Sequence, residues 1–498
     1  MYFQTKDAAC GWLAARGVSN IGVVTRSGVV SVIGGGLAGC EAAWQCASRG
    51  FDVRLFEMRP ARPTAVHRGA GLAELVCSNS FKSLELANAH GLLKAELRVL
   101  GSFVMECAAA ARLPAGAALA VDRDVFTREV TSRIAAHPRI TVIREEVTAL
   151  PEDRPAIVAA GPLCSAPLAE SIAAFTGQES LAFYDAISPI VDGETIDWGI
   201  AFRASRYNKG GGSDYANCPM NRAEYEAFYD ALLAATKADL HAFDRELLFE
   251  GCLPVEELAL RGRDTLRFGP MKPVGLVDPR TGRRPWAVVQ LRQDNLAATH
   301  WSMVGFQNQL KWGEQQRIFR MIPGLAEAEF VKLGMMHRNT YINAPRVLNE
   351  HFEARTRPGL FFAGQISGVE GYTESSAAGL LAGLGAVAHL TGAQPPLLPV
   401  ETALGTLQRY VAGADPEHYA PTNIAFGLMP PLGETIRSKR DRKKALAVRA
   451  LSVLATYIGT CPLLADREGP AAQAAAAAAA PPETEEAPKE RDSARMDD

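Results

Sequence analysis

The stretch ELVCSNSFKS, residues 74–83, places the thiol of Cys77 among small polar side chains that cannot cover it as an apolar core would. Such a thiol is a candidate nucleophile, because the thiolate is the reactive form of cysteine. A free thiol has a pKa of about 8.5 and needs a positive neighbour to ionise near neutral pH. Lys82 follows five residues later. We therefore interpret Cys77 as a candidate reactive cysteine.

A second stretch, VVSVIGGGLAGCEAA, has the residues of a phosphate-binding turn. It carries the spacing G-x-G-x-x-G between an expected strand and an expected helix, and an acidic residue, Glu57, follows 23 residues after Gly34. The first glycine of such a turn permits a tight bend, the second lets backbone amides approach a pyrophosphate, and the third lets helix and strand pack closely. The helix N-terminus favours negative charge, and the acidic residue accepts hydrogen bonds from a ribose. The predicted cofactor contacts are Gly34, Gly35, Gly36, Leu37, Ala38, Gly39 and Glu57.

Three further segments favour FAD as the bound dinucleotide, because a flavin in an extended pose needs contacts from several separated strands. They are residues 140–147, the expected strand that ends at Gly161, and GLFFAGQISG at residues 359–368. The last resembles the flavoprotein strand whose terminal Gly-Asp pair reaches the ribityl and pyrophosphate groups. Gly364 and Gln365 stand at that pair, with Gln in place of the more common Asp, and are predicted to contact the cofactor.

The composition is that of a globular protein with reduced thiols. The 498 residues are 48% hydrophobic, and the formal charge of −3 provides no global attraction to nucleic acid. The nine cysteines lack paired spacing, and no CxxC or Cys/His cluster indicates a zinc site or a disulfide framework. No apolar run approaches the roughly 18 residues that cross a bilayer. We expect a cytoplasmic protein without a membrane segment or a metal site.

The sequence pattern predicts that the elements which position these residues form an α/β fold. We expect a Rossmann-like FAD-binding domain interrupted by an inserted α+β domain. Strand, turn and helix signals occupy residues 29–182 and return in residues 335–468. Residues 183–334 show short alternating runs and turn clusters such as NKGGGSD, which predict the insertion. Residues 1–28 form an extension without strong periodicity. Residues 469–498 are rich in alanine, then in proline and charge, which predicts a disordered tail.

A series of motifs within residues 29–450 resembles the folate- and FAD-dependent tRNA (uracil-C5) methyltransferases, the TrmFO family. In chain order they are VIGGGLAGCEAAW, LVCSNSFKS, YNKGGGSDYANCPMNRAEY, FEGCLPVEELALRGRDTLRFGPMKPVGL, VGFQNQL, MHRNTYINAP and GQISGVEGYTESSAAGLLAG. Several motifs in one order are far more specific than one glycine turn. The resemblance implies transfer of a methylene group from 5,10-methylenetetrahydrofolate, by way of FAD, to C5 of the T-loop uracil of tRNA. Reduction with NAD(P)H through FAD would then give ribothymidine.

The resemblance also implies roles for two cysteines and one tyrosine. C5 of uracil is a poor nucleophile until a thiolate adds to C6, so the reaction requires a cysteine. Cys252 in FEGCLPVEE and Cys77 both match the family's functional cysteines. We assign Cys252 as the nucleophile at C6, and Cys77 as its partner in proton removal or in protection of the flavin adduct; the reverse assignment stays open. Tyr372 in EGYTES resembles the family's tyrosine beside the isoalloxazine ring.

Contacts with the T-arm of tRNA would have to come from local basic regions. One extends from Arg261 to Arg292 with few acids, and it follows Cys252 closely in the chain. The other lies on an expected helix and sets seven cations against Asp441: Arg437, Lys439, Arg440, Arg442, Lys443, Lys444 and Arg449. Either region could neutralise phosphates, although such a run also occurs on an ordinary solvated helix face.

Two other functions agree with part of the sequence. A related wobble-uridine tRNA-modifying flavoprotein shares the glycine turn, but it normally carries a long helical C-terminal domain, whereas this chain becomes low in complexity by about residue 469. A flavin-binding RNA scaffold without catalysis would not need the two cysteine motifs. The sequence therefore favours the methyltransferase, and leaves the oligomeric state and the choice of NADH or NADPH open.

Overall fold

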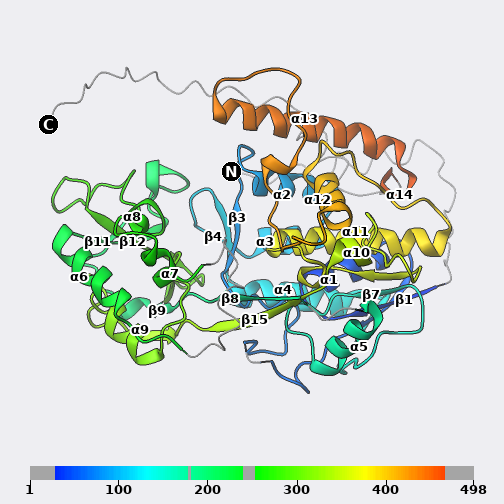
Figure 1. Ribbon diagram of the computed structural model, residues 1–498, viewed down its shortest axis with the longest axis horizontal. Coiled ribbons are helices and arrows are strands. Elements are labelled where there is room, and N and C mark those ends of the chain that lie inside the picture. Colours follow the sequence, from blue (N-terminus) through cyan, green and yellow to red (C-terminus); the bar gives the residue numbers. More distant parts are fainter. Residues whose placement is uncertain (1–27, 65, 178–180, 239–252, 466–498) are drawn as a thin grey trace, which may run out of the picture.

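In the computed structural model of the chain, residues 28–64, 66–177, 181–238 and 253–465 are described. They form two lobes of unequal size that are joined by a pair of long strands (Figure 1). The first lobe contains segments from both ends of the described chain, and the second lobe contains the segment between them. Cys252 and the terminal segments 1–27 and 466–498 lie outside the described residues.

A five-stranded parallel sheet forms the centre of the first lobe. Its strand order is β16-β7-β1-β2-β6, so the strand that follows the insertion, β16, lies beside β7, which precedes it. The strands are short. Most of their residues are buried, because helices cover both faces of a parallel sheet. This arrangement confirms the expected α/β class. The bounds are β1 (Val29–Ile33), β2 (Asp52–Phe56), β6 (Ile140–Ile143), β7 (Ala156–Val158) and β16 (Leu360–Phe362).

Two helices that are far apart in sequence, α1 (Leu37–Ala47) and α11 (Tyr372–Thr391), pack closely beside this sheet. Small residues make the approach possible: a Cβ atom at Gly379 would lie 2.2 Å from the carbonyl oxygen of Ala38. Helix α11 begins at Tyr372. The packing therefore sets the N-terminus of α11, with Tyr372, close to the glycine turn that precedes α1.

The second lobe is built on an antiparallel sheet of six strands in the order β10-β11-β12-β13-β9-β14. Its own hydrophobic core includes the fully buried Trp301, Phe306 and Phe319. Helices beside an antiparallel sheet confirm the expected α+β insertion. The strands are β9 (Ile190–Asp192), β10 (Phe202–Arg203), β11 (Tyr215–Met220), β12 (Ala287–Gln293), β13 (His300–Met303) and β14 (Phe330–Lys332), and the helices are α6 (Arg222–Leu233), α7 (Val255–Leu260), α8 (Thr265–Phe268) and α9 (Trp312–Phe319).

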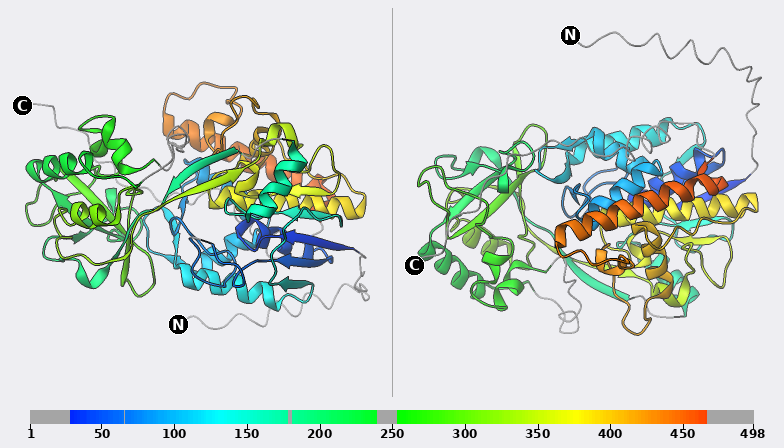
Figure 2. Two further views of the ribbon diagram at one scale, coloured as in Figure 1. Left: turned by 60° about the horizontal axis from the view of Figure 1, so that its bottom comes forward. Right: turned by 90° about the horizontal axis from the view of Figure 1, so that it is seen from above.

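The two lobes are connected by β8 (Leu181–Ala186) and β15 (Met336–Tyr341), which pair antiparallel along their whole length. Figure 2 shows this ribbon running between the lobes from a second direction. The chain enters the second lobe through β8 and returns through β15. Groups at the seam between the lobes can therefore come from segments that are widely separated in sequence.

The remaining elements complete the first lobe. Helix α13 lies along its outer surface (Figure 2). The cations of its first turns are mostly exposed. None of the helices in the described ranges combines the length and the apolar character needed to cross a membrane. The bounds are β3 (Ser80–Ser83), β4 (Arg112–Leu113), β5 (Ala118–Val121), α2 (Ala89–Val99), α3 (Phe103–Ala110), α4 (Arg123–Ala136), α5 (Ala166–Thr176), α10 (Ala344–Val347), α12 (Ala403–Gly413), α13 (Lys439–Thr460) and α14 (Pro462–Ala465).

Candidate active site

The glycine turn between β1 and α1 has different steric demands at the three glycines of its G-x-G-x-x-G spacing. Gly34 has a φ of +102°, and a Cβ atom there would lie 2.4 Å from the carbonyl oxygen of Ala159. A Cβ atom at Gly39 would lie 1.8 Å from the carbonyl oxygen of Gly34, so helix and strand touch through backbone. Gly36, the N-cap of α1, faces space with no atom within 4 Å of an added Cβ. Gly36 thus leaves room for a group that approaches the helix N-terminus.

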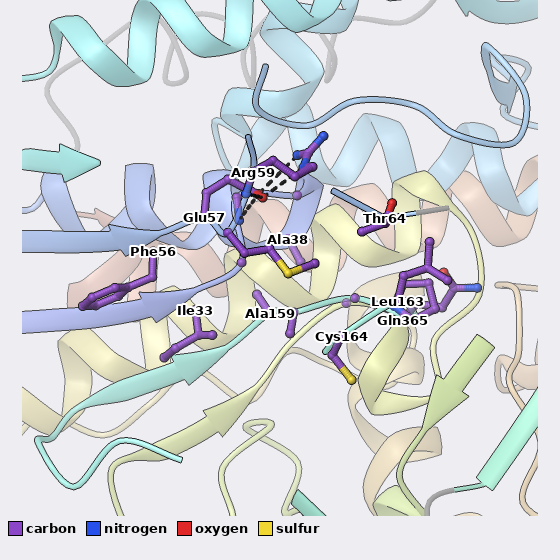
Figure 3. A pocket seen from close by; sticks show the side chains of 18 of the residues that line it. Ile33, Ala38, Phe56, Glu57, Arg59, Thr64, Ala159, Leu163, Cys164 and Gln365 are labelled. Atoms are coloured by element: carbon purple, nitrogen blue, oxygen red, sulfur yellow. Dashed lines mark hydrogen bonds and ion pairs between the residues drawn. The ribbon is translucent and has the colours of Figure 1, made fainter. Parts of the chain in front are cut away.

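A cleft with about 1050 Å³ of empty space, part of it open to solvent, begins at this turn (Figure 3). It lies beyond the carboxyl ends of β1, β2, β7 and β16, where open parallel sheets bind ligands. Its lining includes residues 33–38, Glu57, residues 145–147, residues 159–165 and residues 363–365. The expected contacts from separated strands therefore lie around one cleft. No side chain caps the N-terminus of α1, so its amides are suited to a pyrophosphate, and the cleft fits FAD.

Glu57, at the end of β2, is held by the glycine turn and by an arginine. Its Oε2 accepts a hydrogen bond from the backbone N–H of Gly35 over 3.1 Å, and its Oε1 pairs with Nε of Arg59 over 2.9 Å (Figure 3). Arg59 also pairs with Glu74. Burial acts to raise the pKa of Glu57, but the hydrogen bonds and charge of Arg59 outweigh it and hold that pKa below its usual value. The carboxylate therefore stays ionised and can accept from a ribose hydroxyl.

The loop after β16 lies against the glycine turn. Gly364 has a φ of +79°, and a Cβ atom there would lie 2.8 Å from Cβ of Ala38. The next residue, Gln365, lines the cleft and donates a side-chain hydrogen bond to Glu370. Gln365 can offer its amide to a ligand in this position, whereas the more common Asp could only accept.

Cys77 lies at the edge of this cleft, half-buried, in the loop that leads into β3. Its backbone N–H donates to the phenolic oxygen of Tyr372 over 3.0 Å, and its thiol lies 3.8 Å from the carbonyl oxygen of Ala186, at the end of β8. Its neighbour Val76 and Tyr372 both line the cleft. The structure thus brings together Cys77, Tyr372 and the space that fits FAD.

The positive neighbour of Cys77 is not Lys82. The Lys82 ammonium group donates to Asn423 instead. In the described part of the chain, Arg123 on α4, Arg292 on β12 and Lys332 on β14 interact electrostatically with Cys77. The sequence interpretation connected none of the three with Cys77, because two come from the second lobe and none lies near Cys77 in the chain.

Asn79, two residues after Cys77, joins the two lobes. Its side-chain amide donates to the carbonyl oxygens of Val121 and Gln293, each over 3.0 Å, and its Oδ1 accepts from Nε of Arg292 over 2.7 Å. Asn79 is fully buried, so these hydrogen bonds give its polar atoms protein partners in place of water. The motif around Cys77 therefore forms part of the seam between the lobes.

Most of the other described cysteines lie in buried surroundings that disfavour the reactive thiolate form. Cys46, Cys107 and Cys218 are fully buried, and burial raises the pKa of each thiol to about 12. Cys40 is buried in the same way. Cys164 lines the cleft, and burial raises its pKa as well. Within the described ranges, no group of His, Cys, Asp and Glu side chains is arranged to hold a metal ion.

Comparisons with known proteins decide the family. Residues 29–394 match the family model described as GIDA, glucose inhibited division protein A. Over 431 residues the chain is 60% identical to the methylenetetrahydrofolate–tRNA-(uracil-5-)-methyltransferase TrmFO of Symbiobacterium thermophilum, covering 86% of this chain and 96% of that protein. The chain belongs to the TrmFO family. The TrmFO protein of Pelotomaculum thermopropionicum is 58% identical over 422 residues, covering 85% of this chain and 96% of that one. These matches confirm the family that the motifs indicated.

Solved structures show that this TrmFO chain shares its fold with GidA. The Aquifex aeolicus GidA structure in the form II crystal superimposes with a TM-score of 0.64 at 15% identity, over 91% of this chain and 76% of that one. At that identity the likeness concerns the fold alone. The fold therefore does not separate a TrmFO protein from GidA, whereas the sequence identity to TrmFO proteins does.

Proposed function

We propose that this chain methylates C5 of the T-loop uracil of tRNA, with 5,10-methylenetetrahydrofolate as one-carbon donor, FAD as bound cofactor and NAD(P)H as reductant. The proposal is supported by identity to proteins named methylenetetrahydrofolate–tRNA-(uracil-5-)-methyltransferase. The observation that carries it is the position of Cys77, bonded to Tyr372 at the edge of the FAD-type cleft. A half-buried thiol next to a flavin site suits a reaction that uses a thiolate, and a protein that only holds FAD would not need it.

The residues of the cleft have separate tasks in this reaction. The amides of the glycine turn hold the pyrophosphate, and Glu57 accepts from the ribose. Tyr372, at the first position of α11, presents its ring to the cleft and its oxygen to the Cys77 loop. When bound, FAD supplies the redox and one-carbon carrier chemistry.

The thiols act on the uracil. A thiolate adds to C6, a sulfur–carbon bond forms, and the electron pair of the C5–C6 double bond moves to C5 and the O4 enolate. C5 then bonds to the methylene carbon as one bond of that carbon to its carrier breaks. After the C5 proton is removed, the remaining bond to the carrier breaks and leaves an exocyclic methylene on C5. A hydride that originates from NAD(P)H adds to this carbon to give the methyl group, and departure of the thiolate from C6 restores the C5–C6 double bond. In our assignment Cys252 makes the bond to C6 and Cys77 removes the proton or guards the flavin adduct.

We propose that exposed cations at two places on the surface contact the tRNA. Arg261 and Arg263 surround a surface hollow at the end of α7, next to Phe268, whose surface is 82% exposed. An aromatic face beside cations suits an unpaired base and its phosphate. The exposed cations at the start of α13 form a second candidate contact.

The test is mass spectrometry of an unmodified tRNA transcript incubated with the purified protein, the folate donor and NADH or NADPH. We expect one added methyl group on a T-loop fragment, and none when the folate is omitted. A transcript with cytidine at the target position is the matched control and should stay unmodified. A modification in the anticodon loop would instead support the wobble-uridine function, and no modification with any reductant would support a non-catalytic scaffold.

A further inference from the structure

Three consecutive carbonyl oxygens in the loop that carries Cys77 are bound by cationic side chains. The two terminal nitrogens of Arg123 donate to the carbonyl oxygens of Leu75 and Cys77, the latter over 3.2 Å. The ammonium group of Lys332 donates to the carbonyl oxygen between them, on Val76, over 3.4 Å. The peptide carbonyl groups of residues 75–77 thus all accept from cationic side chains, and Cys77 is the last of these three residues.

Arg123 is itself fixed by the second lobe. It is the first residue of α4, and its Nε pairs with the carboxylate of Asp294 over 3.1 Å. Asp294 directly follows β12 and is buried. The guanidinium group therefore bonds through Nε to the insertion and through its two terminal nitrogens to the Cys77 loop, an arrangement that its rigid fork of donors allows.

Lys332 reaches the same loop from the second lobe, at the end of β14. Burial, followed by the positive charges of Arg123 and Arg68, lowers the pKa of Lys332 to about 8. Its ammonium form predominates at neutral pH and is lost as the pH rises through this value. Positive charge on Lys332 is therefore available at the pH at which a thiol needs help to ionise.

We propose that Arg123 and Lys332 act together as a clamp between the lobes that fixes the backbone of residues 75–77 and favours the thiolate form of Cys77. Among the described residues, the charged groups around this thiol are Arg123 on α4, Arg292 on β12 and Lys332 on β14, with Asp294 as the acid that pairs with Arg123; Tyr372 faces the Cys77 loop from α11. Within this part of the chain, three cations against one acid favour a thiolate. Arg123 and Lys332 are positioning residues, because they act through Cys77.

The clamp rests on the proposed function in one respect, since that function explains why a thiolate is needed at Cys77. Its test uses neither tRNA nor folate. The full-length protein with its FAD is labelled with iodoacetamide between pH 6 and 9.5, and the rate at Cys77 is followed by peptide mass spectrometry. The variants are Lys332→Met, which removes the charge, and Lys332→Arg, which keeps it. Lys311→Met removes an exposed charge from the same lobe and is the matched control.

We expect labelling of Cys77 at pH 7 to be about fivefold slower in Lys332→Met, with the two curves converging at high pH, where the parent lysine has also lost its proton. Lys332→Arg and Lys311→Met should follow the parent curve at pH 7. An unchanged profile in Lys332→Met, or slowing by one factor at every pH, would overturn the electrostatic role. Cys77 that stays unlabelled in the parent up to pH 9 would overturn it too.

A second variant tests the other half of the clamp. Arg123→Lys keeps a positive charge but cannot bind two carbonyl groups and Asp294 together. We expect FAD to be retained, because Arg123 lies outside the cleft lining, and the labelling curve of Cys77 to move to higher pH, with slower labelling at pH 7. A parent-like profile would remove Arg123 from the clamp. If the labelling results hold but no tRNA is methylated, the proposed function fails and the clamp stands.

Discussion

The backbone N–H of Cys77 donates a hydrogen bond to the phenolic oxygen of Tyr372 over 3.0 Å, although 295 residues separate the two in the chain. Tyr372 is the first residue of α11, and the close packing of α11 on α1 sets its position. The ring of Tyr372 also contacts Phe81, which follows the Cys77 loop, with ring centroids 5.5 Å apart. Tyr372 therefore attaches the candidate catalytic loop to the FAD-type cleft through both its hydroxyl group and its ring.

Tyr372→Phe removes the acceptor of this bond and keeps the ring. We expect FAD content to be unchanged and ribothymidine formation to fall about fivefold, because a lost hydrogen bond of about 1 kcal/mol loosens the Cys77 loop. The measurement is the initial rate of methylation together with the flavin absorbance. Tyr410→Phe removes a hydroxyl group that bonds to the carbonyl oxygen of Ala420, outside the cleft lining, and should leave the rate unchanged. An equal effect in both variants would show a general loss of stability.

Gly36→Val should abolish FAD binding. The position faces open space at the N-terminus of α1, so the valine fits the protein but occupies the place where a pyrophosphate would approach. The purified variant should be soluble and colourless. Gly413→Val, also at a position with no atom within 4 Å of an added Cβ, is the control and should stay yellow. Stoichiometric FAD in Gly36→Val would refute the assignment of the turn.

Cys252→Ala should separate flavin chemistry from RNA chemistry. Hydride transfer to FAD needs no thiol, so FAD and its reduction by NAD(P)H should persist while ribothymidine formation stops. A T-loop RNA with 5-fluorouracil should trap the parent protein covalently, because fluorine at C5 cannot leave as a proton. The complex should vanish in Cys252→Ala and persist in Cys77→Ala.

Peptide mapping of the trapped complex decides between the two thiols. An adduct on Cys252 supports our assignment, and an adduct on Cys77 reverses it. An adduct on neither cysteine would reject covalent catalysis for this chain. Cys252 lies outside the described residues, so this experiment is the direct route to its role.

Asn79→Ala should destabilise the seam between the lobes. The change leaves the buried Arg292 without its acceptor and two buried carbonyl groups without their donor. We expect a loss of about 2 kcal/mol in the free energy of unfolding, and a melting temperature lower by about 2–4 °C. Circular dichroism measures the shift. Gln316→Ala, at an exposed position of α9, should change the melting temperature by less than about 1 °C.

The sequence by itself determined the features that depend on neighbouring residues. The glycine turn between β1 and α1 could be predicted because its three glycines, the flanking strand and helix, and Glu57 follow one another within a short span, and backbone sterics at Gly34 and Gly39 leave few alternatives. The α/β class and the presence of an insertion also follow from local periodicity. The order of several motifs was sufficient for the family.

Only the tertiary structure decided what surrounds Cys77. The nearest lysine in sequence, Lys82, turns to Asn423, whereas the cations at the thiol come from α4, β12 and β14. Lys332 reaches the carbonyl group of Val76 across 256 residues of chain, because the ribbon of β8 and β15 places the second lobe against the first. Local patterns specify helices, strands and turns. The charge around a side chain depends on the packing of distant elements, which no short stretch of sequence contains.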